Sequence, residues 1–113
     1  MWLRLRQIAL VASDLDAVLD EFRSVLGIEV CFVDPSVKVF GLRNSLMTVG
    51  NQFIEVVSPV QDGTTAGRYL ERRNGDGGYM VITQCDDHAP RKARVEARGV
   101  RQAWGMETEH YRC

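Results

Sequence analysis

The sequence predicts an α+β fold built from paired βαβββ modules, the second of them incomplete within its 113 residues. The stretch 7–27 joins an alternating strand to an amphipathic helix, and further strands follow before Pro59. The order strand, acidic turn, helix, glycine, strand recurs over 79–103, at a period of about seventy residues. We therefore expect a single domain, with module one over about 1–60, a linker and short helix over about 61–77, and a partial module two over about 78–113.

The stretch 7–27 is the best-defined unit of the pattern. Side chains alternate along a strand, so Gln7 shares a face with Ala9 and Val11. We expect Ser13 to cap the following helix and Gly27 to end it. The helix carries one apolar stripe with spacings of three and four residues, formed by Leu15, Val18, Leu19, Phe22, Val25 and Leu26.

The rest of module one reads as short strands separated by turn residues. Gly50 and Asn51 form a two-residue turn, which predicts a hairpin between the strands on either side. Arg43 to Ser45 reads as a polar connection. The expected strands are 28–34, 37–42, 46–49 and 52–58.

Module two follows a glycine-rich turn. The linker before it carries the expected helix 66–73, and the expected elements of module two are strand 78–85, helix 89–98 and a strand that begins over 100–104. A second module matching the first needs about two more strands. The final residues EHYRC read as a strand opening, so the repeat predicts a chain truncated after Cys113.

Composition excludes several classes of function. A net charge of -1 provides no electrostatic attraction for nucleic acid or an anionic membrane. The sequence contains no run of about eighteen apolar residues, and its start does not resemble a signal peptide, so we expect a cytoplasmic protein. The three cysteines are widely spaced and predict no disulfide framework.

Three segments together resemble a known superfamily. The strand and turn QIALVASDLD, the later strand QFIEVVSP and the segment GDGGYMVITQCDD occur in the order found in vicinal oxygen chelate proteins. That superfamily includes glyoxalase I, methylmalonyl-CoA epimerase, extradiol dioxygenases and bleomycin resistance proteins. The resemblance covers roughly residues 5–100 and implies a curved mixed sheet around a cavity.

The resemblance also implies a metal site. Its ligands would be Gln7 on the first strand and Glu55 on the fourth, with Glu55 acting as ligand or as catalytic base. Met80 stands where the family normally has a third ligand, a histidine, and a thioether suits such ions poorly. The implied cofactor is a divalent ion, with Zn, Ni, Mn, Fe and Co not distinguishable.

The residues themselves allow other interpretations. Glu55 shares a strand face with Phe53 and Val57, and a carboxylate among apolar neighbours is costly unless it meets a cation or a donor. Gln7 fits equally an ordinary strand amide bonded to backbone or water. His88 fits a helix-start residue, and His110 opens the last expected strand. Three arginines, Arg68, Arg72 and Arg73, fit a solvated helix face or contacts to an anionic substrate.

Two functions follow from this pattern. One is a divalent-metal-dependent lyase, isomerase or dioxygenase acting on a small carbonyl or CoA-type substrate. The other is a metal-free module that binds or sequesters a small molecule, like the bleomycin resistance proteins, in an apolar groove. Residues suited to such a groove are Phe53, Met80, Ile82 and Trp104. In either case we expect a homodimer with a small-molecule ligand.

Overall fold

The computed structural model describes residues 1–107 and has the predicted α+β fold with a mixed sheet. The chain forms two compact units. The larger unit comprises Leu5–Thr83, and the smaller unit contains Met1–Arg4 together with the chain from Gln84 onward. The two units are described separately below.

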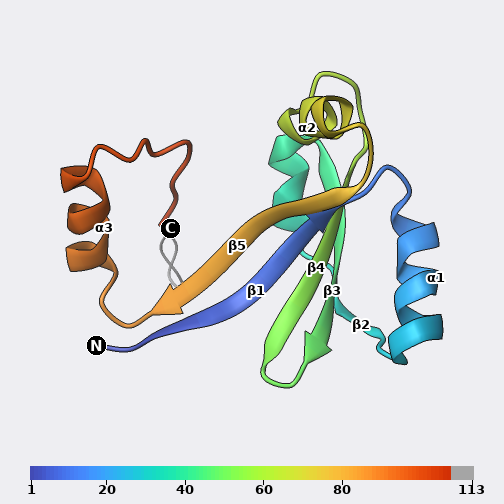
Figure 1. The fold of residues 1–113 in the computed structure, drawn as a ribbon, viewed down its shortest axis with the longest axis horizontal. Coiled ribbons are helices and arrows are strands. Elements are labelled where there is room, and N and C mark those ends of the chain that lie inside the picture. Colours follow the sequence, from blue (N-terminus) through green and yellow to red (C-terminus); the bar gives the residue numbers. More distant parts are fainter. Residues whose placement is uncertain (108–113) are drawn as a thin grey trace. The chain divides into compact units, whose positions relative to one another are not determined.

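The elements follow one another as strand, helix, short strands, helix, strand and helix (Figure 1). Their bounds are β1 Leu3–Val11, α1 Leu15–Leu26, β2 Val30–Phe32, the 3-10 helix η1 Pro35–Phe40, β3 Leu42–Val49, β4 Gln52–Pro59, α2 Thr65–Arg73, β5 Gly77–Cys85 and α3 His88–Ala97.

The five strands form one sheet in the order β2-β3-β4-β1-β5. Strands β3 and β4 pair antiparallel as the predicted hairpin, whereas β1 and β4 pair in parallel. The register sets Ala9 of β1 and Leu46 of β3 on either side of Glu55 in β4. Partners in register project to the same face of a sheet, so this register decides which side chains surround Glu55.

Helix α1 begins and ends as its sequence dictates, with one correction. The N-cap is Asp14, whose carboxylate accepts a hydrogen bond from the backbone N–H of Ala17, and not Ser13 as predicted. Ser13 instead donates through its N–H and its hydroxyl to Asp76, which ties the end of β1 to the turn before β5. Gly27 ends the helix in the left-handed conformation, as predicted.

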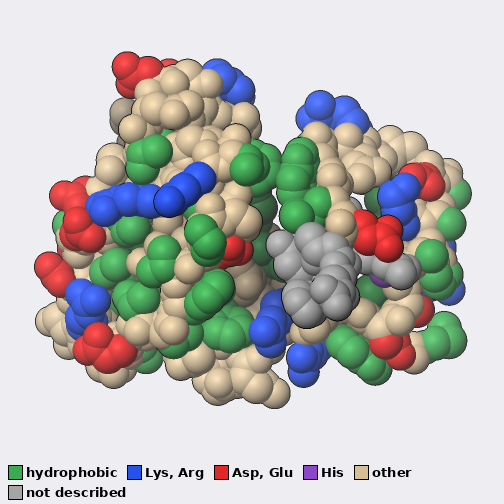
Figure 2. Space-filling view, turned by 180° about the vertical axis from the view of Figure 1, so that it is seen from behind, with side chains coloured by type: hydrophobic (Ala, Val, Ile, Leu, Met, Phe, Trp, Pro, Cys, Tyr) green, Lys and Arg blue, Asp and Glu red, His purple; other side chains and the backbone are tan. Residues whose placement is uncertain are grey.

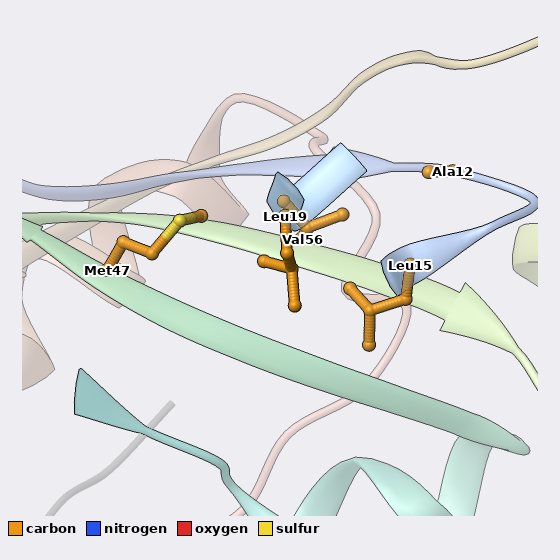
Figure 3. Close-up of a cluster of buried hydrophobic side chains, with 5 residues drawn as sticks. All are labelled: Ala12, Leu15, Leu19, Met47 and Val56. Carbon is orange, nitrogen blue, oxygen red and sulfur yellow. The ribbon is translucent and has the colours of Figure 1, made fainter. Parts of the chain in front are cut away.

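The apolar stripe of α1 packs on one face of the sheet. Figure 3 shows the five buried side chains of this cluster, which come from α1, the β1–α1 connection and strands β3 and β4: Ala12, Leu15, Leu19, Met47 and Val56. Leu19 is 5% exposed, whereas Val25 at the end of the same stripe is 77% exposed. The fully buried side chains of α1 therefore lie in the first two turns of the helix.

A second cluster lies on the opposite face of the sheet, which also carries Glu55. Ala66 of α2 packs there with Val11, Leu42 and Val57. The rings of Tyr69 and Tyr79 meet edge to face beside this cluster, with centroids 5.2 Å apart. Helix α2 thus covers one end of the Glu55 face.

Two predictions for the segment between α1 and β4 are wrong. The strand expected over 37–42 is not formed, apart from Leu42, which begins β3, because Asp34 caps a 3-10 helix that has Pro35 at its first position. Residues 43–45 are not a connection but part of β3, which runs continuously from Leu42 to Val49. The polar residues misled the interpretation, since Asn44 and Ser45 are both buried in the sheet.

The smaller unit contains α3 and the first residues of the chain. The N-terminal amine of Met1 and the N–H of Trp2 both bind the carboxylate of Asp86. Within the described residues, the strand expected over 100–104 is absent, so that prediction is wrong. The expected strand opening EHYRC, residues 109–113, which includes His110, lies outside the described residues.

Apolar side chains also reach the surface. In Figure 2 the hydrophobic side chains appear as several separate patches between backbone and charged groups. Three apolar residues are each more than half exposed: Phe32 at the end of β2, Val33 directly after it and Val39 in η1. Within residues 1–107, no helix is long and apolar enough to cross a membrane.

The packing of α1 predicts that substitutions at two positions of its apolar stripe change the free energy of unfolding by different amounts. Leu19→Ala should lower the free energy of unfolding by about 2–5 kcal/mol, because it opens a cavity between α1 and the sheet. Val25→Ala removes an exposed side chain of the same stripe and should change it by less than about 1 kcal/mol. Urea unfolding of both variants checks this; equal losses would contradict the observed packing.

Candidate functional site

The candidate site lies on the sheet face opposite α1. Gln7 of β1 is in register with Phe53 of β4, two residues before Glu55 on the same face. Asn44 of β3 is in register with Val57, two residues after Glu55. The parallel pairing of β1 and the antiparallel pairing of β3 thus place one amide on each side of the carboxylate.

The two amides hold the carboxylate directly. Gln7 Nε2 donates to Glu55 Oε1 over 2.8 Å, and Asn44 Nδ2 donates to Glu55 Oε2 over 2.6 Å. Glu55 is 7% exposed and Asn44 is 2% exposed, whereas Gln7 is half-buried. The carboxylate therefore has the hydrogen-bond donors that a buried charge requires.

Asn44 is itself held by the chain before η1. Its Oδ1 accepts a hydrogen bond of 3.0 Å from the backbone N–H of Asp34. The Asp34 carboxylate in turn accepts from the N–H of Ser36 in the first turn of η1. The site is thus connected to a capped helix end as well as to three strands.

Burial dominates the electrostatics of Glu55. Loss of solvent raises the pKa of its carboxyl above the ordinary value, and the hydrogen bonds from Asn44 and Gln7 offset this only in part. The negative charge of Asp34 raises the pKa further. A carboxyl whose pKa is raised toward neutrality is suited to accept and return a proton.

The structure brings together Gln7 and Glu55, the two residues predicted as metal ligands. A carboxylate and an amide oxygen are donors that divalent ions accept, so this pair fits two positions of a coordination sphere. Over residues 1–107, no cluster of three or more His, Cys, Asp or Glu side chains could hold a metal ion. Their role as ligands stays a prediction.

Met80 does not join this pair. Tyr79 packs against the cluster of Val11 and Val57, on the Glu55 face, so alternation along β5 places Met80 on the other face. Its side chain is 49% exposed. The position at which the family normally has its third ligand is therefore not on the Glu55 face, and Met80 does not share a face with Phe53, the residue expected beside it in an apolar groove.

The remaining candidates belong to helices α2 and α3. His88 starts α3 in the smaller unit, where Asp87 is the N-cap position, and no side-chain cap is formed. Arg68 donates to the Gly63 carbonyl and the Thr65 hydroxyl at the start of α2. The Arg73 guanidinium lies 5.6 Å from the centre of the Tyr69 ring.

Asn44 is the site residue that sequence reasoning missed. The signal was present: Leu42, Asn44 and Leu46 alternate with Arg43 and Ser45, as expected for a strand with one buried face. Three adjacent polar residues, Arg43 to Ser45, predicted a loop instead. A buried Asn on a strand is informative because it must be satisfied by specific partners.

Comparison with known proteins agrees with the fold. The model of the family described as "Glyoxalase-like domain" matches residues 8–112. The chain belongs to this glyoxalase-like family. The predicted resemblance to the vicinal oxygen chelate superfamily is thereby confirmed.

Relatives of this glyoxalase-like chain include epimerases. An ethylmalonyl-CoA/methylmalonyl-CoA epimerase of Cereibacter sphaeroides is 26% identical over 98 residues, which cover 87% of this chain and 72% of the relative. Methylmalonyl-CoA epimerase from Mycobacterium tuberculosis has a TM-score of 0.78 at 19% identity, with 93% of this chain and 71% of that chain covered.

A further solved structure has the same fold. It is a variant of the Streptomyces coelicolor methylmalonyl-CoA epimerase in complex with 2-nitronate-propionyl-CoA, with a TM-score of 0.81 at 21% identity. The alignment covers 94% of this chain and 80% of that chain. At this identity the likeness establishes the fold of the glyoxalase-like chain and not its activity.

The raised pKa of Glu55 predicts that the difference in stability between Glu55→Gln and the wild type changes with pH. A raised folded-state pKa favours folding at low pH, and this contribution is lost as pH rises from the ordinary value of 4.5 through the folded value. Glu55→Gln removes the titration. Its free energy of unfolding should therefore rise relative to that of the wild type over this range and then stay level.

Urea unfolding between pH 4 and about 8, with a chelator present, measures this difference. Glu71→Gln makes the same chemical change on the exposed face of α2 and serves as the control. A free energy of unfolding of Glu55→Gln that falls relative to that of the wild type as pH rises would show that burial does not destabilise the carboxylate.

Proposed function

We propose that this chain is an isomerase that inverts the α-carbon of a branched dicarboxylic acyl-CoA ester. The observation that carries the proposal is the buried carboxylate of Glu55, held by Gln7 and Asn44 on the sheet face opposite α1. The epimerase relative from Cereibacter sphaeroides supports this substrate class. Among the reactions considered from sequence, these comparisons favour an isomerase over a lyase or dioxygenase.

The chemistry requires one proton to leave carbon and one to return. A hydrogen on the carbon between a thioester carbonyl and a carboxylate is acidic, because the electron pair left behind is delocalised into the thioester as an enolate. Glu55 takes this proton as general base. Water then delivers a proton to the opposite face of the enolate, which gives the other epimer, and the hydroxide left behind takes the proton from Glu55 and restores its carboxylate.

The burial of Glu55 suits this role. A carboxylate with an ordinary pKa is a weak base near neutral pH, and burial raises the pKa of Glu55. Gln7 and Asn44 donate to the ionised form, so the base remains usable in spite of its burial. The balance of these effects produces a base that can also release its proton.

A divalent ion would be held by the amide oxygen of Gln7 and a carboxylate oxygen of Glu55. When bound, it would polarise the substrate carbonyl and stabilise negative charge on oxygen. Gln7 would have to turn its amide, since Nε2 now faces Glu55. Glu55 would then serve as ligand in place of base, and the two roles make different predictions.

Proton removal can be measured apart from inversion. In D₂O, methylmalonyl-CoA or ethylmalonyl-CoA should acquire deuterium at the α-carbon in the presence of the protein. Glu55→Gln should slow this exchange by about 10²–10⁴-fold, the usual contribution of a general base. Mass spectrometry of the CoA ester follows the exchange, and Glu71→Gln should exchange as fast as the wild type.

If the wild type exchanges deuterium into neither methylmalonyl-CoA nor ethylmalonyl-CoA, the chain is not an isomerase of this substrate class. Binding of an apolar small molecule without any exchange would favour the metal-free binding module. The cytoplasmic location and the homodimer expected from the sequence are part of the proposal, and light scattering of the purified chain checks the dimer.

The metal prediction has its own test. Elemental analysis of the purified protein should find one equivalent of a divalent ion, and Gln7→Ala and Glu55→Ala should each lose it, because each removes one of the two converging oxygens. Thr48→Ala, a change at an exposed position of β3, serves as the control. A parent protein that takes up no metal after loading would exclude Gln7 and Glu55 as ligands and leave Glu55 as base.

A further inference from the structure

We infer that Asn44 is a positioning residue that gives the two carboxylate oxygens of Glu55 different roles. The hydrogen bond from Asn44 fixes Glu55 Oε2. Glu55 Oε1 is the oxygen that can release its hydrogen bond from Gln7 and take up a proton or a cation. The catalytic consequence of this inference rests on the proposed isomerase function. The hydrogen-bond arrangement behind it can be tested without that function.

The amide of Asn44 can point only one way. The backbone N–H of Asp34 is a donor and requires an acceptor, so it must face Oδ1 of Asn44. The Nδ2 group is then left facing Glu55 Oε2, to which it donates over 2.6 Å. Turning the amide would set donor against donor at Asp34 and acceptor against acceptor at Glu55.

The segment that fixes Asn44 is itself held. The Asp34 carboxylate accepts from the N–H of Ser36, which closes the first turn of η1 at Pro35. The donors therefore run in one direction, from Ser36 to Asp34 to Asn44 to Glu55. Because the Ser36 and Asp34 donors are backbone N–H groups, neither can become an acceptor, and the orientation of the Asn44 amide follows from them.

Gln7 has no such constraint. It donates through Nε2 to Glu55 Oε1, and among the hydrogen bonds of residues 1–107 its own Oε1 accepts none. The side chain is half-buried, whereas that of Asn44 is 2% exposed. A half-turn of the Gln7 amide exchanges a donor for an acceptor, which a protonated carboxyl or a cation at Glu55 Oε1 would require.

The sheet also separates the two oxygens. Strand β4 lies between β3, which carries Asn44, and β1, which carries Gln7. Glu55 Oε2 therefore faces β3 and the fixed amide of Asn44, and Glu55 Oε1 faces β1 and the amide of Gln7, which can turn. Proton transfer or cation binding occurs at Oε1, and Asn44 keeps the carboxyl plane in the orientation that presents it.

Loss of Asn44 should affect turnover more than substrate binding. Asn44→Leu keeps the side-chain size but removes the donor to Oε2 and the acceptor for Asp34. We expect kcat to fall by about 10- to 100-fold, as for other residues that orient a reacting group, with KM changed by less than about twofold. Asn44→Asp keeps an acceptor for Asp34 but replaces the donor with a second carboxylate beside Glu55, so its loss of kcat should be at least as large.

Ser58→Ala is the matched control. Ser58 is as buried as Asn44, lies in the neighbouring strand, and donates a hydrogen bond of 2.6 Å to the Ala12 carbonyl. Its loss should destabilise the fold without touching Glu55, and kcat should stay within about twofold of the wild type. Equal losses of kcat in Ser58→Ala and both Asn44 variants would show that only stability is involved.

Side-chain amide NMR of the ¹⁵N-labelled protein tests the arrangement itself. The two amide protons of Asn44 should exchange slowly with solvent and keep their shifts in Ser58→Ala, while those of Gln7 should exchange faster. Asn44 amide protons that exchange as fast as those of Gln7 would overturn the inference, whether or not the CoA esters react. Slow Asn44 exchange together with no turnover would refute the proposed function alone.

Discussion

The parallel pairing of β1 with β4 is the constraint on which the site depends. It joins segments that are far apart in sequence, since Gln7 and Glu55 are separated by 48 residues. Parallel neighbours need a crossover, and here α1 and the β2–β3 segment provide it. A shift of the register by one residue would turn Gln7 away from Glu55 and expose the apolar partners of α1. The packing of α1 therefore protects the geometry of the site on the opposite face.

The two faces of the sheet are used differently. The α1 face is apolar throughout its cluster, which contains Met47 and Val56 at its centre. The other face is divided: α2 covers the end at Val57, and the part at Glu55 keeps polar groups. Burying a carboxylate costs stability that an apolar residue would not, and this cost is typical of residues retained for function. The amide donors limit the cost without removing the raised pKa.

Much of this architecture could be predicted from sequence because its signals are local. The strand and helix of residues 7–27 and the hairpin at Gly50 follow from periodicity and turn chemistry, whereas the pairing of Gln7 with Glu55 was implied only by the resemblance to the superfamily. The 3-10 helix at Pro35 could not be distinguished from a strand, since its apolar residues also alternate. The strand expected over 100–104 rested on the internal repeat alone.

The candidate site was predictable only in part, for a different reason. Spacing along β4 shows that Glu55 shares a face with Phe53, but not which residues of other strands come within hydrogen-bond distance. Asn44 was hidden because its partners, Asp34 and Glu55, are both distant in sequence. The face occupied by Met80 depends on how β5 packs against α2, through Tyr79.

The hairpin and the parallel pair also differ in when they can form. Strands β3 and β4 are joined by a two-residue turn, so their pairing closes a short loop and can form early in folding. Pairing of β1 with β4 must close a loop of more than forty residues and follows later. Asn44 and Glu55 therefore meet first, and the arrival of Gln7 completes the site. A partly folded chain would hold the carboxylate through one oxygen while the other still faced water.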